Sequence, residues 1–258
     1  MSFDLADFDD VRRFAAAVSS SFEAVDFLVL NAALSDERKP GSFVAKSGHD
    51  SMYVVNYLSN FLLARLLLPK LAPGGSVVLV SSVVMWGAMV DLLMPPGGRF
   101  PWENRTDVNQ YQQYQVSKLA LCVCLRDSLG RALAGRGVKV RSMVPGYIET
   151  NMTRLVWTHP LYKPDVYHWL AKADVGGRLL FETAFATPLA PDHDFFYAFW
   201  FPSEVFRPLR PQALWQFRVG IAGFFTQPQM YQRLFGMRLH SSVSPECDEP
   251  TRRALWSW

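Results

Sequence analysis

The sequence predicts an α/β fold in which helices cover a parallel sheet. Continuous apolar runs at 26–30, 76–80 and 138–144 are typical of parallel strands that are buried on both faces. Segments with helical periodicity lie between these runs, and polar or turn-forming residues follow each run. Strands that alternate with helices in this way predict a doubly wound sheet with helices on both of its faces.

Local signals predict the individual elements. Asp7 is a favourable N-cap residue for the first helix, and its side chain can accept a hydrogen bond from a free backbone amide. Pro69 and the breaker at 73–75 close the second helix. In chain order we expect the end of a strand at 2–5, a helix at 9–22, a strand at 26–30, a helix at 49–71, a strand at 76–80, a helix at 107–135 and a strand at 138–144.

Length and composition restrict the function classes. The 258 residues suffice for a single α/β domain, with the sheet core in 1–150 and a substrate-pocket and C-terminal region in 151–258. A formal net charge of +3 without a basic cluster argues against a nucleic-acid partner. The five histidines show no metal-ligand spacing, so we expect no metal site.

Cysteine usage and hydropathy indicate the compartment. The cysteines Cys122, Cys124 and Cys247 are sparse and odd in number, which is typical of buried thiols in a reducing compartment. The acidic N-terminus does not read as a signal peptide. Polar residues interrupt the apolar stretch 53–71, which favours a buried helix over a membrane span. We therefore expect a cytoplasmic protein without a membrane span.

Tyr114 and Lys118 are the first candidates for site residues. Their spacing of four places both side chains on one face of a helix. An ammonium beside a phenol stabilises the phenolate and allows proton exchange below the free tyrosine pKa of about 10. Such pairs also occur on solvated helices. Asn31, Ser82 and the loop 145–150 strengthen the case, because they follow predicted strands at the edge where open α/β sheets bind ligands.

These pieces together resemble the short-chain dehydrogenase/reductase family. Short motifs that match the family appear in the family's order along the first 150 residues. They are Asp4-Leu5, Asn31-Ala32-Ala33 with alanine in place of the family's glycine, Asn56, Ser82, the Tyr114–Lys118 pair, and Pro145-Gly146 followed by Thr150.

The resemblance implies a role for each matched residue. Tyr114 would transfer a proton to or from the substrate oxygen, and Ser82 would hydrogen-bond the substrate carbonyl. Lys118 would lower the tyrosine pKa and hold the nicotinamide ribose, and Asn56 would hold a water in a proton relay. The remaining matches, Asn31, Pro145, Gly146 and Thr150, would border a cofactor only if a nicotinamide binds.

The sequence departs from the family at its start. The resemblance implies two earlier strands and a turn, Thr-Gly-x-x-x-Gly-x-Gly, that holds a pyrophosphate at a helix N-terminus. The sequence begins at the family's third strand, so we expect an incomplete Rossmann-like sheet that lacks the first two strands. The strand at 26–30 would then form an apolar edge, which residues 2–5 or a second subunit of a homo-oligomer should cover.

Three function hypotheses follow. The first is an enzyme of secondary metabolism that acts without a cofactor on an apolar terpenoid- or polyketide-like molecule, as an isomerase, a lyase or a cyclase, including a Diels–Alder-type cyclase. Tyr114 and Ser82 would activate the substrate carbonyl by hydrogen bonds, and the aromatic stretch 195–201 would form either core or a wall of the apolar pocket. The second hypothesis is an NAD(P)H-dependent oxidoreductase, and the third is a non-catalytic binding protein.

Overall fold

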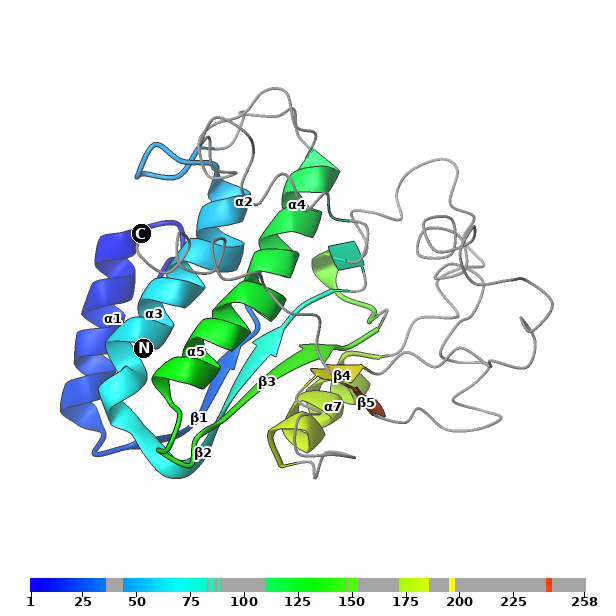
Figure 1. The fold of residues 1–258 in the computed structure, drawn as a ribbon. Helices are drawn as coiled ribbons and strands as arrows, with labels where there is room; N and C mark the ends of the chain where they lie inside the picture. Colours follow the sequence, from blue (N-terminus) through cyan, green and yellow to red (C-terminus); the bar gives the residue numbers. More distant parts are fainter. Residues whose placement is uncertain are drawn as a thin grey trace.

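A five-stranded sheet organises the part of the chain that the structure, a computed structural model, describes. The described residues are 1–35, 44–82, 84–85, 88, 110–146, 148–152, 172–185, 195–197 and 240–242. The strands lie in the order β1 (Val25–Leu30), β2 (Leu71–Val80), β3 (Lys139–Val144), β4 (Phe195–Tyr197) and β5 (His240–Ser242). Strands β1 to β4 are parallel and β5 is antiparallel to β4 (Figure 1), which confirms the predicted α/β class.

The predicted helices are present with small shifts at their ends. Asp7 caps the first helix, because its carboxylate accepts a hydrogen bond from the amide of Asp9 at 2.9 Å. The third predicted helix begins at 110 in the described residues, since 107–109 lie outside them. The first helix is α1 (Phe8–Ser21) and the last is α7 (Ala173–Phe185). The second is a continuous helix made of α2 (Ser51–Tyr53), η1 (Val54–Leu58), α3 (Ser59–Leu67) and η2 (Leu68–Lys70). The third is continuous in the same way and is made of α4 (Gln110–Leu119), η5 (Ala120–Leu125) and α5 (Arg126–Ala132).

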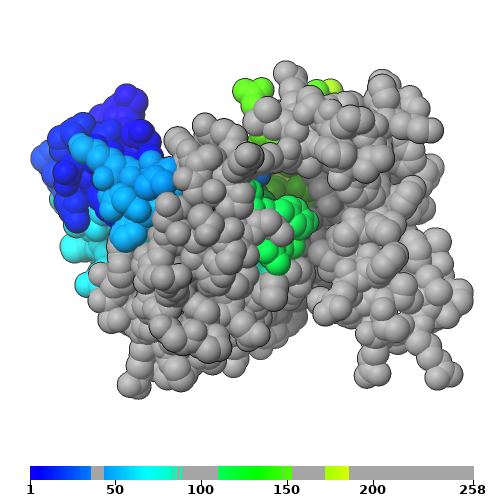
Figure 2. Space-filling view, turned by 90° about the horizontal axis from the view of Figure 1, so that it is seen from above, coloured from blue at the N-terminus to red at the C-terminus, as the bar shows by residue number. Residues whose placement is uncertain are grey.

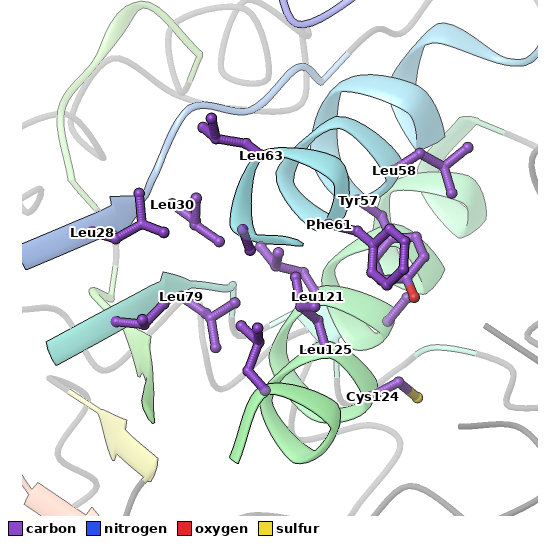
Figure 3. Close-up of a cluster of buried hydrophobic side chains, with 14 of the residues drawn as sticks. Leu28, Leu30, Tyr57, Leu58, Phe61, Leu63, Leu79, Leu121, Cys124 and Leu125 are labelled. Atoms are coloured by element: carbon purple, nitrogen blue, oxygen red, sulfur yellow. The ribbon is translucent and has the colours of Figure 1, made fainter. Parts of the chain in front are cut away.

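Successive residues of β2 point to opposite faces of the sheet, as the period of a strand requires. Val77 and Leu79 face a large apolar core that α1, α3 and η5 cover. Figure 3 shows the side chains of this core converging from both strands and helices. Val78 faces the other side, where it packs with Met143 of β3 and with Leu179 of α7. The sheet therefore has helices on both faces.

Burial on both faces is confirmed for β2 and is wrong for β1. Leu28 and Leu30 of β1 are buried, whereas Phe27 and Val29 are each 43% exposed. Among the described residues, their face of the sheet meets the end of α7, where the ring of Phe27 lies 4.6 Å from that of Phe185. Helix α7 packs mainly on β2 and β3, so it leaves this face of β1 partly open.

The predicted strand end at 2–5 is also wrong. The amide of Asp4 donates to the carboxylate of Asp10 at 2.8 Å, and the Asp4 carboxylate accepts from the amide of Ala6 at 2.8 Å. These side chains take the backbone groups that a strand would pair with a neighbour, while Phe3 stacks on Phe14 of α1. Residues 2–5 therefore do not cover β1, the edge strand of the described sheet. Cover by a second subunit stays a prediction.

The region after residue 150 contributes β4 and β5 to the same sheet, which the sequence did not reveal. In the aromatic stretch 195–201, residues 195–197 form β4 and residues 198–201 lie outside the described residues. Cys122 is a buried free thiol, as expected. Cys124 is disulfide-bonded, so the expectation of free thiols is wrong there.

One helix in the described part of the chain, Ser51–Lys70, is long and apolar enough to span a membrane by length and composition alone. Of its most apolar window, 78% is buried inside the protein. A helix that packs against the sheet in this way is typical of the core of a globular fold, and it agrees with the predicted buried helix.

Gly75 lies where β2 approaches β1 most closely. A Cβ atom there would sit 2.6 Å from the carbonyl oxygen of Asp26 and 2.9 Å from that of Ala72. Because both are backbone atoms, we expect Gly75→Ala to lower the free energy of unfolding by about 1–3 kcal/mol. Gly130→Ala is the matched control: the site has open space in α5 and should gain about 0.5–1 kcal/mol. Urea denaturation measures both, and equal losses would contradict the close approach.

Candidate active site at the carboxyl ends of the strands

Helix α4 brings Tyr114 and Lys118 to the carboxyl edge of the sheet. Lys118 is only 2% exposed, whereas Tyr114 is half-buried. The Lys118 ammonium lies 5.9 Å from the centre of the Tyr114 ring. In the view onto this edge, atoms of the green segment that begins with α4 reach the surface (Figure 2). The predicted pair therefore shares one face of the helix.

Two reciprocal hydrogen bonds fix α4 to the end of β2. The ammonium of Lys118 donates to the carbonyl oxygen of Val80 at 2.9 Å. In return, the hydroxyl of Ser81 donates to the carbonyl oxygen of Lys118 at 3.0 Å. Farther along the helix, the hydroxyl of Ser142 in β3 donates to the carbonyl oxygen of Cys122 at 2.7 Å. Ser81, directly after β2, and Ser142 of β3 thus satisfy carbonyl groups near the end of α4 and within η5.

Both helices that line the site contain a π-helical stretch, η1 and η5. Such stretches are rare and occur mainly at functional sites, because the wider turn redirects side chains. The wider turn also leaves backbone carbonyl groups that need other donors. In η1 the Asn60 side-chain amide donates to the carbonyl oxygens of Val55 at 2.9 Å and Asn56 at 3.2 Å.

Asn56 connects the loop after β1 to helix α4. Its side-chain oxygen accepts from the amide of Leu34 at 2.6 Å, and its nitrogen donates to the Leu34 carbonyl oxygen at 2.9 Å. The same nitrogen donates to the hydroxyl of Ser117 at 3.0 Å, which in turn donates to the carbonyl oxygen of Tyr114 at 2.8 Å. These contacts describe a positioning residue, and the predicted role of Asn56 in a water relay stays a prediction.

The hydroxyl of Tyr114 meets two groups. It donates to the sulfur of Met152 at 3.7 Å, and the nearby hydroxyl of Ser82, the residue that follows β2, acts to lower its pKa. The structure therefore brings together Tyr114 and Ser82, the two predicted hydrogen-bond donors for a substrate oxygen. Met152 is a third member of this cluster that the sequence analysis missed.

Burial determines the protonation of the pair. It raises the pKa of Tyr114 to about 12, against the lowering effect of the Ser82 hydrogen bond. It lowers the pKa of Lys118 to about 8, because the charged form loses its hydration. The expected decrease in the tyrosine pKa is therefore not found, and Tyr114 is a neutral phenol that can donate a hydrogen bond.

Comparison with known proteins agrees with this geometry. Residues 1–89 match the family model described as short chain dehydrogenase. The chain is 30% identical over 175 residues to the short-chain dehydrogenase/reductase tropG of Talaromyces stipitatus, covering 63% of this chain and 50% of that protein. It is 31% identical over 173 residues to the short chain dehydrogenase yanD of Aspergillus niger, covering 62% and 50%. The chain belongs to the short-chain dehydrogenase/reductase family.

A solved structure shares the fold of this chain. A putative uncharacterized protein from Mycobacterium paratuberculosis has a TM-score of 0.59, is 23% identical, and is matched over 100% of this chain and 72% of its own. At that identity the likeness shows a shared Rossmann-like fold. The chain spans about half the length of the two curated relatives that it matches.

The family implies a nicotinamide cofactor, and the described residues fit its ribose poorly. In the family the lysine of the motif holds the ribose, but here the Lys118 ammonium is buried and donates to Val80. The other candidate contacts are more open. Asn31 and Thr150 are exposed, and Pro145 and Gly146 are half-buried. Lys118 is thus directed into the protein, away from the position in which it would bind a ribose hydroxyl.

The sequence analysis also missed Ser81 and Ser117, which hold α4 in place. Both lie beside predicted site residues, Ser81 before Ser82 and Ser117 before Lys118, so their position in the motif is the signal that could have found them. Met152 lies two residues beyond Thr150 and carries no comparable signal.

The depressed pKa of Lys118 predicts a specific pH dependence of stability. Above a pH of about 8 the folded lysine is neutral, whereas the unfolded lysine keeps its proton up to its ordinary pKa of 10.5. The unfolded state then binds more protons, so stability rises with pH in this window and the gain is lost as the pH falls through about 8. Relative to Lys118→Met, the wild-type free energy of unfolding should increase by about 2 kcal/mol between about pH 7 and about pH 9.5. Urea denaturation across this range measures the difference, and parallel curves for the two proteins would contradict it.

Proposed function

We propose that this protein activates the carbonyl group of an apolar small molecule of secondary metabolism, and that it does so without a nicotinamide, as an isomerase, lyase or cyclase. The observation that carries this proposal is the pair of hydroxyls at the carboxyl edge of the sheet. The Ser82 hydroxyl is near enough to Tyr114 to act on the pKa of the phenol, and burial keeps Tyr114 a neutral phenol. A substrate oxygen between them accepts a hydrogen bond from each.

Two fixed donors at one oxygen stabilise the negative charge that develops there during enolisation, elimination or cyclisation. The donors are preorganised because their supports are rigid. Ser82 follows a buried strand, and α4 is held by Lys118, Ser81 and the Asn56–Ser117 contact. The site therefore needs little rearrangement when charge develops.

Lys118 adds a positive charge behind the phenol. Its ammonium lies 5.9 Å from the centre of the Tyr114 ring and is shielded from water, because the side chain is buried. A charge in such surroundings acts over this distance more strongly than in water. It therefore favours the state in which Tyr114 has given its proton towards the substrate oxygen.

Hydrogen exchange at carbon tests this proposal without a known substrate. In deuterium oxide, the protein should accelerate exchange of the α-hydrogens of cyclohexanone, which proton NMR follows as a loss of signal. Tyr114→Phe and Ser82→Ala should each slow the accelerated exchange by about 10²-fold, as expected for the loss of one oxyanion donor. Tyr111→Phe is the matched control, because Tyr111 is 57% exposed on the same helix and should leave the rate unchanged. Equal rates for all four proteins would refute the catalytic role of the two hydroxyls and favour a binding protein.

An NAD(P)H-dependent oxidoreductase is the second candidate function. The family model and both relatives favour it, since all are described as dehydrogenases. In this reaction Tyr114 and Ser82 would keep the same roles at the substrate oxygen. Lys118 would have to leave the Val80 carbonyl oxygen to reach a ribose hydroxyl.

Titration with NADPH and NADH separates the two candidates. The chain holds eight tryptophans, whose fluorescence reports binding. The first candidate predicts no saturable change up to about 1 mM cofactor, a concentration above the usual range of enzyme affinities. Saturable binding at micromolar concentration, with consumption of NADPH in the presence of acetophenone, would overturn the cofactor-independent proposal in favour of the reductase.

A further inference from the structure

The single hydroxyl proton of Tyr114 is directed at Met152. A thioether sulfur has no proton and can only accept a hydrogen bond. The contact of 3.7 Å between the Tyr114 hydroxyl and the Met152 sulfur is therefore donated by the tyrosine. In the structure, Met152 occupies the acceptor position that a substrate carbonyl needs.

The segment that carries Met152 is anchored on its far side. Gly146 begins it with a φ of 77°, in the left-handed region that favours glycine. The side chain of Ile148 packs against α7, where it would lie 3.4 Å from a Cβ atom at Gly176. Glu149 forms an ion pair with Lys172, the residue before α7. These contacts place the helical turn at 151–152 beside α4, so the sulfur reaches the hydroxyl from a supported backbone.

We propose that Met152 is a placeholder for the substrate carbonyl oxygen: its thioether holds the Tyr114 proton until a ketone displaces it. This inference rests on the proposed function. It assigns Met152 a role in substrate selection. The side chain is half-buried, so it can move aside without opening the core.

Sulfur suits this role because it is a weak acceptor. Hydroxyl-to-oxygen hydrogen bonds have lengths near 2.7–2.8 Å, whereas this contact spans 3.7 Å. A ketone oxygen therefore gains a better hydrogen bond than the one it displaces. A strong acceptor in the same place would compete with the substrate, and an apolar side chain would leave the proton undirected.

The displaced side chain also favours a class of substrate. Methionine is unbranched and adapts its shape to apolar neighbours. Once moved aside, it lies against the group beside the carbonyl. Ketones with apolar substituents should therefore bind better than keto acids, whose carboxylate would lose hydration against the thioether.

Two variants of Met152 test the placeholder with acetophenone as the probe. Met152→Leu keeps the size and removes the acceptor, whereas Met152→Gln keeps the length and supplies a strong amide acceptor. Infrared spectra of the bound probe report the carbonyl stretch, and a titration of the spectra gives its dissociation constant. We expect Met152→Gln to raise the dissociation constant about tenfold, the equivalent of one competing hydrogen bond. When Met152→Gln is saturated with the probe, the carbonyl stretch should have the same shifted frequency as in the wild type, because Tyr114 then donates to the probe.

The matched variant Met152→Leu should bind the probe within about threefold of the wild type, since it removes only a weak contact. Equal dissociation constants for Met152→Gln and Met152→Leu would overturn the placeholder. Tyr114→Phe separates this outcome from a failure of the proposed function. If the carbonyl stretch of the bound probe has the same frequency in Tyr114→Phe as in the wild type, the tyrosine does not activate carbonyl groups at all.

Oxidation of the folded wild-type protein repeats the test with a side chain that is altered only after folding is complete. Hydrogen peroxide transfers one oxygen to the methionine sulfur and leaves as water, and the sulfoxide oxygen is a strong acceptor. Treated wild type should lose probe affinity about tenfold, and treated Met152→Leu should lose none of its affinity. An equal loss in both proteins would assign the effect to the other methionines and overturn the placeholder.

Discussion

The reciprocal hydrogen bonds between Lys118 and the end of β2 are the constraint on which the site depends. One runs from the helix side chain to the strand backbone, and the other runs from the strand side chain of Ser81 to the helix backbone. Both lie in buried surroundings, where an unmet partner would cost the full desolvation of its group. The pair therefore fixes the height of α4 above the sheet. Tyr114, one turn earlier, and Ser82, one residue later, come within reach of each other as a consequence.

This constraint also sets the chemistry. A lysine that is exposed beside a tyrosine would favour the phenolate, which is what the motif alone suggested. Here burial acts on both groups at once, raising the pKa of Tyr114 to about 12 and lowering that of Lys118 to about 8. The phenol therefore keeps its proton and serves as a donor. An uncharged donor with a fixed partner is suited to carbonyl polarisation in any reaction that develops charge on oxygen.

The elements that could be predicted are those with a strong local signal. The apolar runs at 76–80 and 138–144 are real strands because burial on both faces demands such runs, and Asp7 marks a helix start because its carboxylate satisfies a free amide. Candidate residues at strand ends were found for the same reason, since topology alone brings the carboxyl ends together. The pairing of Tyr114 with Ser82 followed from this argument and from the family motif.

The features that escaped prediction depend on tertiary context. Residues 2–5 have an apolar pattern, but the carboxylate of Asp10 accepts from the amide of Asp4, and the carboxylate of Asp4 accepts from the amide of Ala6. Spacing put Lys118 on the correct face of its helix, yet it carries no information on the side-chain torsions that direct the ammonium to Val80. The short strands β4 and β5 have three residues each, too few for a period to be recognised. Met152 reaches the site through the packing of Ile148 on α7.

The π-helical stretch η5 changes the direction in which the side chains before and after it point. A widened turn acts as one extra residue, and one residue turns a helix by about 100°. The side chains of α5 therefore follow a different angular register from those of α4, although the backbone is continuous. The first half can face the site while the second half packs against β3. Substitutions that repack α5 would thus leave the angular position of Tyr114 unchanged, so the stability of the core and the geometry of the site can evolve separately along a single helix.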